Sequence, residues 1–274
     1  MKPETRRTLQ WAGTLYVAGV IFAAGNGSAA SAQDPSANSQ LTEPAAQEVS
    51  SPPRVLSLED RADIFMARKN YLDAVDYYYR ALKESKFQNP AVWNKLGIAY
   101  QQQLNYRAAR KAYNEALHRQ KTYPEAWNNL GTTYFMENKF KKSVKYYVRA
   151  LKLKPDSASF HLNLGTSYYR LKKYPESVSE YRTALSLEPN VLAERSAMGT
   201  VVQARSADAL YYFYLAKVFA SLGRVDEAVR HLRRAFEDGF KDFKKVDEDP
   251  DFQKISGFPA YIELMKNRPV SIKD

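Results

Sequence analysis

Cysteine is absent from this chain of 274 residues, which excludes thiol catalysis, cysteine-based zinc sites and disulfide bonds together. Only 11 glycines are present, a scarcity that disfavours an all-β or a Rossmann-like design. The three histidines, His118, His161 and His231, lie too far apart for the short ligand spacings of a metal site. No nucleophile elbow, zinc-binding helix or phosphate loop occurs. We therefore expect a protein that is not an enzyme and that holds no metal and no small-molecule cofactor.

What is present points to a packed and basic protein. Apolar residues make up 45% of the chain and aromatic residues 13%, and tyrosine is unusually frequent, with 20 copies. That composition supports a sizeable core. The formal net charge is +11, which makes acidic surfaces suitable partners.

The N-terminus has the three-part order of a secretory signal peptide. Basic residues (Lys2, Arg6, Arg7) precede an apolar run from Trp11 to Ala24, and small residues follow up to Ala32. A spanning helix needs about 20 apolar residues, more than this run contains. We assign residues 1–32 to a signal peptide and expect export, to the periplasm or the exterior, after cleavage near Ala32. An uncleaved leader that anchors the protein in a membrane is the alternative. For an exported chain without a recognition motif, nucleic acid is not an expected partner.

Residues 33–57 are rich in Ser, Ala, Gln and Pro and poor in apolar side chains. Such a composition buries too little apolar surface to offset the entropy of ordering the chain. The segment is therefore predicted to be a disordered linker.

A period of 34 residues dominates the rest of the chain. The positions that recur in the predicted first helices are Trp93 and Trp127; Leu96, Leu130 and Leu164; Gly97, Gly131 and Gly165; and Tyr100, Tyr134 and Tyr168. Those that recur in the second helices are Ala109, Ser143 and Ser177; Tyr113, Tyr147 and Tyr181; and Ala116, Ala150 and Ala184. Within each helix the apolar positions follow the 3.6-residue spacing of one helix face. Two such short amphipathic helices cannot bury both apolar faces alone, so each unit needs neighbours.

A 34-residue helix–turn–helix unit with Trp-x2-Leu-Gly-x2-Tyr, then a small residue, an aromatic residue, Ala and Pro, resembles the tetratricopeptide repeat (TPR) family. The resemblance is strongest in residues 90–123, 124–157 and 158–191, although His161 replaces Trp in the last. Residues 55–89 and 209–242 match more loosely. The resemblance implies an all-α fold, a right-handed α-solenoid of about five repeats over residues 58–242, with a C-terminal cap over 243–274.

Two segments lie outside the repeats. Residues 192–208 interrupt the period as an insertion, either a loop or small hairpin or another helix, and insertions tend to gather on the binding face of repeat proteins. In the tail, Asp249 and Pro250 are predicted to start a short helix that Gly257 stops, and Pro259 to Lys266 are a candidate for a second one. We expect the tail to cover the end of the last repeat. A weaker alternative is an enzyme hidden in the insertion and tail.

By the resemblance, the first helix of each unit lines the concave surface and would hold a peptide or protein segment. The predicted groove residues are Asn94, Lys95, Ile98, Gln101, Asn128, Asn129, Thr132, Phe135, Asn163, Thr166, Tyr169 and Lys217. The asparagine amides could hold the backbone of an extended peptide; alternatively they are merely solvated. Phe135 and Tyr169 are expected to be the best exposed aromatic candidates for ligand stacking. Lys95, Arg170 and Lys217 are too scattered for a clamp on a C-terminal carboxylate, so a chaperone-tail receptor is not predicted.

A basic stripe runs along the predicted second helix of the unit at residues 124–157, the third of the five. Lys141, Lys145, Arg149 and Lys152 recur along one face that should point to the convex side. The favoured function is an exported, non-enzymatic scaffold with a protein or peptide partner. The alternative function is an envelope-associated adaptor whose basic face binds an anionic envelope component, lipid or glycan. A solvated face without a partner is the plain alternative.

Overall fold

The structure is a computed structural model, and it describes residues 55–192 and 209–268. Contacts divide the chain into two units, Met1–Pro52 and Pro53–Asp274, and all described residues belong to the second. The predicted signal peptide, most of the predicted linker and nearly all of the insertion lie outside the described residues. No helix among those described combines the length and the apolar character that crossing a membrane requires.

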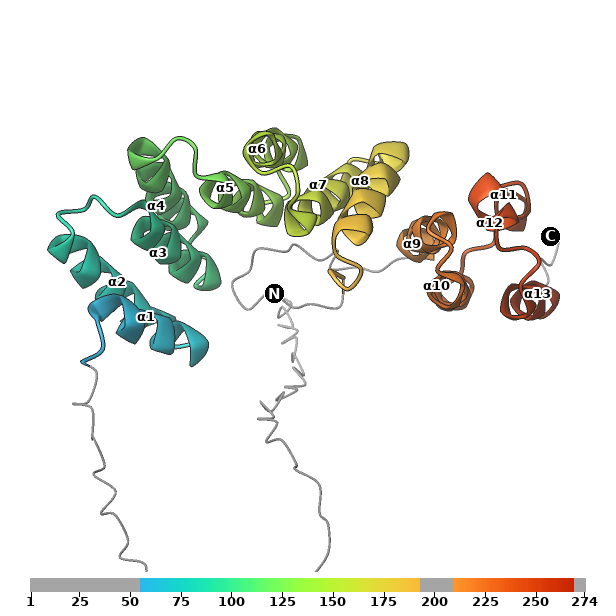
Figure 1. Cartoon of the computed structure of the whole chain (residues 1–274), viewed down its shortest axis with the longest axis horizontal. Helices are drawn as coiled ribbons and strands as arrows, with labels where there is room; N and C mark the ends of the chain where they lie inside the picture. The colour runs from blue at the N-terminus through green and yellow to red at the C-terminus, as the bar shows by residue number, and fades with distance from the viewer. Residues whose placement is uncertain (1–54, 193–208, 269–274) are drawn as a thin grey trace, which may run out of the picture. The chain divides into compact units, whose positions relative to one another are not determined.

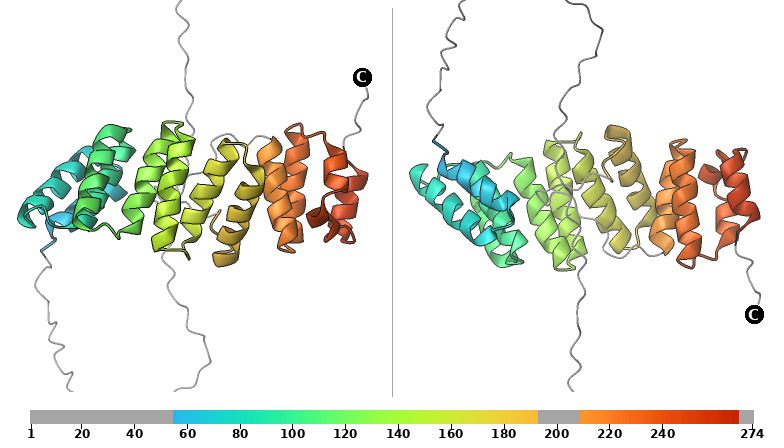
Figure 2. Two further views of the ribbon diagram at one scale, coloured as in Figure 1. Left: turned by 90° about the horizontal axis from the view of Figure 1, so that it is seen from above. Right: turned by 90° about the horizontal axis from the view of Figure 1, so that it is seen from below.

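The described residues form thirteen helices and no strand, so the predicted all-α class is confirmed. Ten of these helices make five antiparallel pairs that lie side by side in chain order (Figures 1 and 2). The pairs are α1 (Leu58–Ala67) with α2 (Tyr71–Glu84), α3 (Pro90–Gln102) with α4 (Tyr106–Arg119), α5 (Pro124–Met136) with α6 (Phe140–Leu153), α7 (Ala158–Arg170) with α8 (Tyr174–Leu187), and α9 (Ala209–Ser221) with α10 (Val225–Glu237). The first helix of each pair also packs against the second helix of the pair before it.

The recurring glycines explain how closely the two helices of a pair approach. A Cβ placed on Gly131 would lie 2.7 Å from the ring of Tyr147, and one on Gly165 would lie 2.7 Å from the ring of Tyr181. A Cβ on Gly97 would collide with Tyr113 in the same way. These tyrosines are fully buried. The Gly–Tyr pairs therefore set the spacing of the helices within the three central units.

The turn inside each pair contains one residue in the left-handed region. In four of the pairs this residue is not glycine: Lys69, Leu104, Asn138 and Lys172 have φ between 59° and 60°. Gly223 takes the same role in the fifth pair, with φ 71°. Only the glycine adopts this conformation without a steric cost.

Three short helices follow the last pair: α11 (Phe243–Asp247), α12 (Pro250–Gln253) and α13 (Pro259–Lys266). The side chain of Asp249 caps α12 by accepting from the backbone N–H of Asp251. α12 packs against α9, and α13 packs against α10. The predicted C-terminal cap is thus present, although α11 was not predicted and α12 ends before Gly257.

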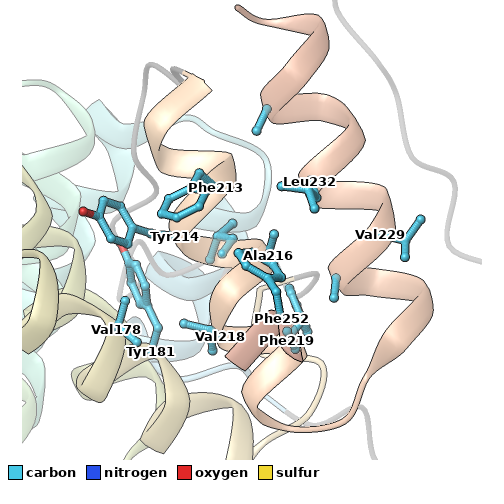
Figure 3. Packing of buried hydrophobic residues seen from close by; sticks show 14 of the residues in the cluster. Val178, Tyr181, Phe213, Tyr214, Ala216, Val218, Phe219, Val229, Leu232 and Phe252 are labelled. Carbon is cyan, nitrogen blue, oxygen red and sulfur yellow. The ribbon is translucent and has the colours of Figure 1, made fainter. Parts of the chain in front are cut away.

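The largest apolar cluster joins the cap to the last repeat. Phe252 of α12 lies within it, with its ring centroid 5.7 Å from that of Phe213 of α9 (Figure 3). Tyr181 of α8 and Leu232 of α10 complete the same cluster and are fully buried (Figure 3). The cap therefore shields apolar surface that the end of the stack would otherwise expose.

Candidate functional site

All predicted groove residues except Lys217 lie on α3, α5 and α7, first helices that are adjacent in space. α3 contacts α5, and α5 contacts α7, in addition to their contacts with the second helices. Four asparagines link these three helices through their side-chain amides. Asn129 Nδ2 donates to Asn94 Oδ1 at 3.0 Å, and Asn163 Nδ2 donates to Asn128 Oδ1 at 2.9 Å. Asn128 Nδ2 donates to Asn129 Oδ1 at 3.2 Å, which joins the two bonds into one chain.

This chain of amides, which we call the asparagine chain (Asn94, Asn129, Asn128 and Asn163), is buried. Asn128 and Asn163 expose none of their surface, and Asn94 exposes 5%. Buried amides are costly unless they are hydrogen-bonded, and here they satisfy one another across repeat boundaries. The structure therefore places these side chains where they fix neighbouring first helices. That they bind a peptide backbone stays a prediction.

Other predicted groove residues contact the buried tyrosines of their own repeats. Tyr147 Oη donates to Thr132 Oγ1, and Tyr181 Oη donates to Thr166 Oγ1, both at 3.1 Å. Tyr113 Oη donates to Gln101 Oε1 at 3.1 Å. These acceptors, and also Ile98, are buried.

The expected exposure of the two aromatic candidates is wrong. Phe135 and Tyr169 expose only 6% and 7% of their surface. Phe135 packs edge-on against Phe140 at a centroid distance of 5.2 Å, and Tyr169 packs against Tyr211 at 5.4 Å. Periodicity placed them on the correct helices, but aromatic neighbours from the same or the following unit cover their rings.

The two predicted groove lysines are held in ion pairs. Lys95 Nζ lies 2.8 Å from Glu59 and 2.6 Å from Asp63 of α1. Lys217 Nζ lies 2.6 Å from Asp249 and 3.0 Å from Asp251 of the cap. Burial alone would lower the pKa of each lysine, but hydrogen bonds to the paired carboxylates raise it above its ordinary value.

These four acidic partners were not predicted from the sequence. Each carboxylate lies 32 to 36 residues from its lysine, which is about one repeat length, and this spacing was a usable signal. Lys95 and Lys217 are thus neutralised within the protein. They do not form a free cationic clamp.

The four residues of the predicted basic face (Lys141, Lys145, Arg149 and Lys152) are all exposed on α6. None of them makes an ion pair with any residue in the described ranges. Beside them is a surface pocket of about 520 Å³, the outer pocket, which sequence reasoning also missed. It is lined by Trp127, Lys145, Tyr146, Val148, Arg149 and Lys152.

The outer pocket has an aromatic wall and a cationic rim. The rings of Trp127 and Tyr146 are stacked with centroids 6.0 Å apart, and the Arg149 guanidinium lies 5.8 Å from the Trp127 centroid. Trp127 Nε1 donates to the backbone oxygen of Lys121 at 2.9 Å, so the indole is fixed in place.

Within residues 55–192 and 209–268, no three His, Asp or Glu side chains are grouped to hold a metal ion.

Comparisons with known proteins agree with the helical pairs. Models of the tetratricopeptide repeat family match residues 90–123, 124–157 and 158–191. Residues 90–191 therefore form three tetratricopeptide repeats. No curated protein sequence matches it.

Among solved structures, one of MamA is 20% identical and has a TM-score of 0.46, covering 68% of this chain and 96% of that one. A second, MamA 41-end from Desulfovibrio magneticus RS-1, is 15% identical with a TM-score of 0.47, and covers 66% and 92%. The Sgt2 TPR domain from Aspergillus fumigatus is 23% identical with a TM-score of 0.40, and covers 43% and 79%. Similarity at this level does not extend to partners.

Proposed function

We propose that this protein is an exported, non-enzymatic scaffold that holds a peptide or protein segment of a partner along the surface of its first helices. Tetratricopeptide repeats over residues 90–191 support a role in protein–protein interaction. The leader, with its basic start, apolar run and small residues before Gln33, supports export. Adsorption to an anionic lipid or glycan through the basic face stays a prediction.

The single observation that carries the proposal is the asparagine chain across α3, α5 and α7. It fixes three adjacent first helices relative to one another before any partner arrives. A surface fixed in advance loses little conformational entropy on binding, which favours affinity for an extended segment. On this proposal the asparagines act by holding the binding surface in shape, and the half-buried residues beside them contact the partner.

Site-specific crosslinking tests the proposal. Glu125 lies three residues before Asn128 and Gln102 lies four residues after Ile98, so each shares a helix face with predicted groove residues. Both are half-buried. A photoreactive amino acid at either position, in the full chain expressed in its own envelope, should capture the same partner. The matched control is Ser179, an exposed position on the second helix α8.

Adducts that form at Glu125 and Gln102 but not at Ser179 would support binding along the first helices. Equal capture at all three positions, or capture at Ser179 alone, would overturn it. The location is tested separately, because N-terminal sequencing of the exported protein should begin at Gln33. A protein found in the cytoplasm with its leader intact would contradict the export part alone.

A further inference from the structure

α6 differs from the other second helices in its charge. Its sequence has five basic residues and no acidic one, whereas α2, α4, α8 and α10 each contain at least one carboxylate. On α4 and α10, by contrast, acidic residues of the same helix pair with some of the cations, as Glu115 does with Arg119 and Glu237 with Arg234. Because α6 has no carboxylate of its own, its cations are available to a carboxylate of another molecule.

The neighbouring repeats show what occupies the equivalent place. In the second unit (α3 and α4), the Arg119 guanidinium lies 5.1 Å from the ring centroid of Trp93 and pairs with Glu115. In the fourth unit (α7 and α8), His161 stands where the tryptophan would be, and its Nδ1 lies 2.6 Å from Glu180. In both units, therefore, a carboxylate of the second helix pairs with a nitrogen-bearing side chain at the tryptophan position. In one unit this side chain lies over the tryptophan, and in the other it replaces the tryptophan.

The third unit has the aromatic residue and the cations but lacks this carboxylate. Trp127 is the equivalent of Trp93, and both indoles donate to a backbone oxygen six residues earlier. Arg149 occupies the position of Glu115, and Tyr146 occupies that of Glu180, each exactly one 34-residue period away. The outer pocket lies where these substitutions meet.

The lining of the outer pocket selects between kinds of anion. Its charged groups are the cations of Lys145, Arg149 and Lys152, and the rest of its lining is Trp127, Tyr146 and Val148. No carboxylate or amide side chain lines it, and sugar hydroxyls need such acceptors as well as donors. An anionic membrane surface would meet the cations but has no protruding side chain to enter a hollow of about 520 Å³. An acidic peptide offers both carboxylates and a bulky apolar side chain.

We propose that the outer pocket binds an acidic segment of a partner protein, with a large apolar side chain against Trp127 and Tyr146 and flanking carboxylates on Lys145, Arg149 and Lys152. This site lies on the α5–α6 pair and is independent of binding along the first helices. Charge-assisted hydrogen bonds from the rim give the segment affinity, and the aromatic wall gives it selectivity for the apolar side chain.

The test uses the full chain and an acetylated peptide in which phenylalanine stands between two pairs of acidic residues. Calorimetry of the full chain with this peptide gives the Kd. Arg149→Glu places the residue of the second unit at this position, and Trp127→His places that of the fourth. Each variant should weaken binding by at least about tenfold, and so should replacing the phenylalanine of the peptide by alanine.

Arg107→Glu is the matched control. Arg107 is exposed and makes no ion pair with the described residues, and its substitution changes the net charge as much as Arg149→Glu does. It should change the Kd by less than about twofold at physiological salt, where separated charges are screened. An equal loss in this control, or no peptide binding at all, would overturn the proposal. It would also be overturned if vesicles with anionic phospholipid, or an acidic oligosaccharide, bound in an Arg149-dependent way while the peptide did not. Circular dichroism checks that both pocket variants fold.

Discussion

Replacing Asn128 by leucine tests whether the asparagine chain stabilises the stack of repeats. The change keeps the approximate volume of the side chain and removes both of its amide groups. Asn163 Nδ2 then loses an acceptor at 2.9 Å, and Asn129 Oδ1 loses a donor at 3.2 Å. Because these partners are buried, each lost bond should cost about 1–2 kcal/mol. We expect the free energy of unfolding to fall by about 2–4 kcal/mol.

Urea denaturation of the full chain, followed by circular dichroism at 222 nm, measures this change. Asn114→Leu is the matched control, because Asn114 is exposed on α4 and the substitution is chemically the same. Asn94→Leu gives an intermediate case, since it removes only one bond of the asparagine chain, the 3.0 Å bond from Asn129. The expected order of destabilisation is therefore Asn128, then Asn94, then Asn114.

A cost below about 1 kcal/mol for Asn128→Leu, or one no larger than that of the control, would refute this reasoning. The asparagine chain would then add little to stability, and the buried amides would need another explanation. Direct contact with a partner would become the more economical one.

Three further results are expected. Lys217→Met should destabilise the cap by about 2–3 kcal/mol, because it leaves Asp249 and Asp251 nearly buried without their main counterion; hydrogen exchange should quicken first in α12. Burial lowers the pKa of His231 to about 4, below the ordinary 6.5, so folding favours its neutral form. The free energy of unfolding should therefore fall by at most about 3 kcal/mol as the pH drops from 6.5 to 4. In a pH-dependent denaturation series, His231→Phe should remove that part of the fall. Leu104→Gly should raise the midpoint of thermal unfolding, with a gain of about 0.5–1 kcal/mol, because leucine at φ 60° is strained and its side chain is 64% exposed; a lower midpoint would mean that the leucine makes contacts of value.

Much of the fold could be predicted because the chain repeats itself. Gly131 and Tyr147 recur at a fixed spacing, and that spacing follows from the close approach of the two helices they join. Pro124 and Pro259 begin helices where the sequence predicts, since proline suits a first turn. The short helix α11 has too few residues to show a period, so periodicity could not reveal it.

The candidate site was harder to predict, for a physical reason. Periodicity gives the face of a helix on which a residue lies, but it does not give the distance to the next repeat. Asn128 and Tyr169 lie on the predicted helices and are nevertheless covered by neighbouring side chains. The outer pocket depends on what α6 lacks, a carboxylate, and only comparison with Glu115 and Glu180 in the adjacent units makes that lack visible.

The cap also limits how the chain can lengthen by duplication. Phe252 packs against α9, and Lys217 of that helix is paired with Asp249. A sixth repeat added after α10 would therefore have to displace both of these cap residues. A copy inserted among residues 90–191 would instead meet neighbours built on its own pattern. Longer descendants of this chain should therefore have gained their extra units in the middle and kept the same closing segment.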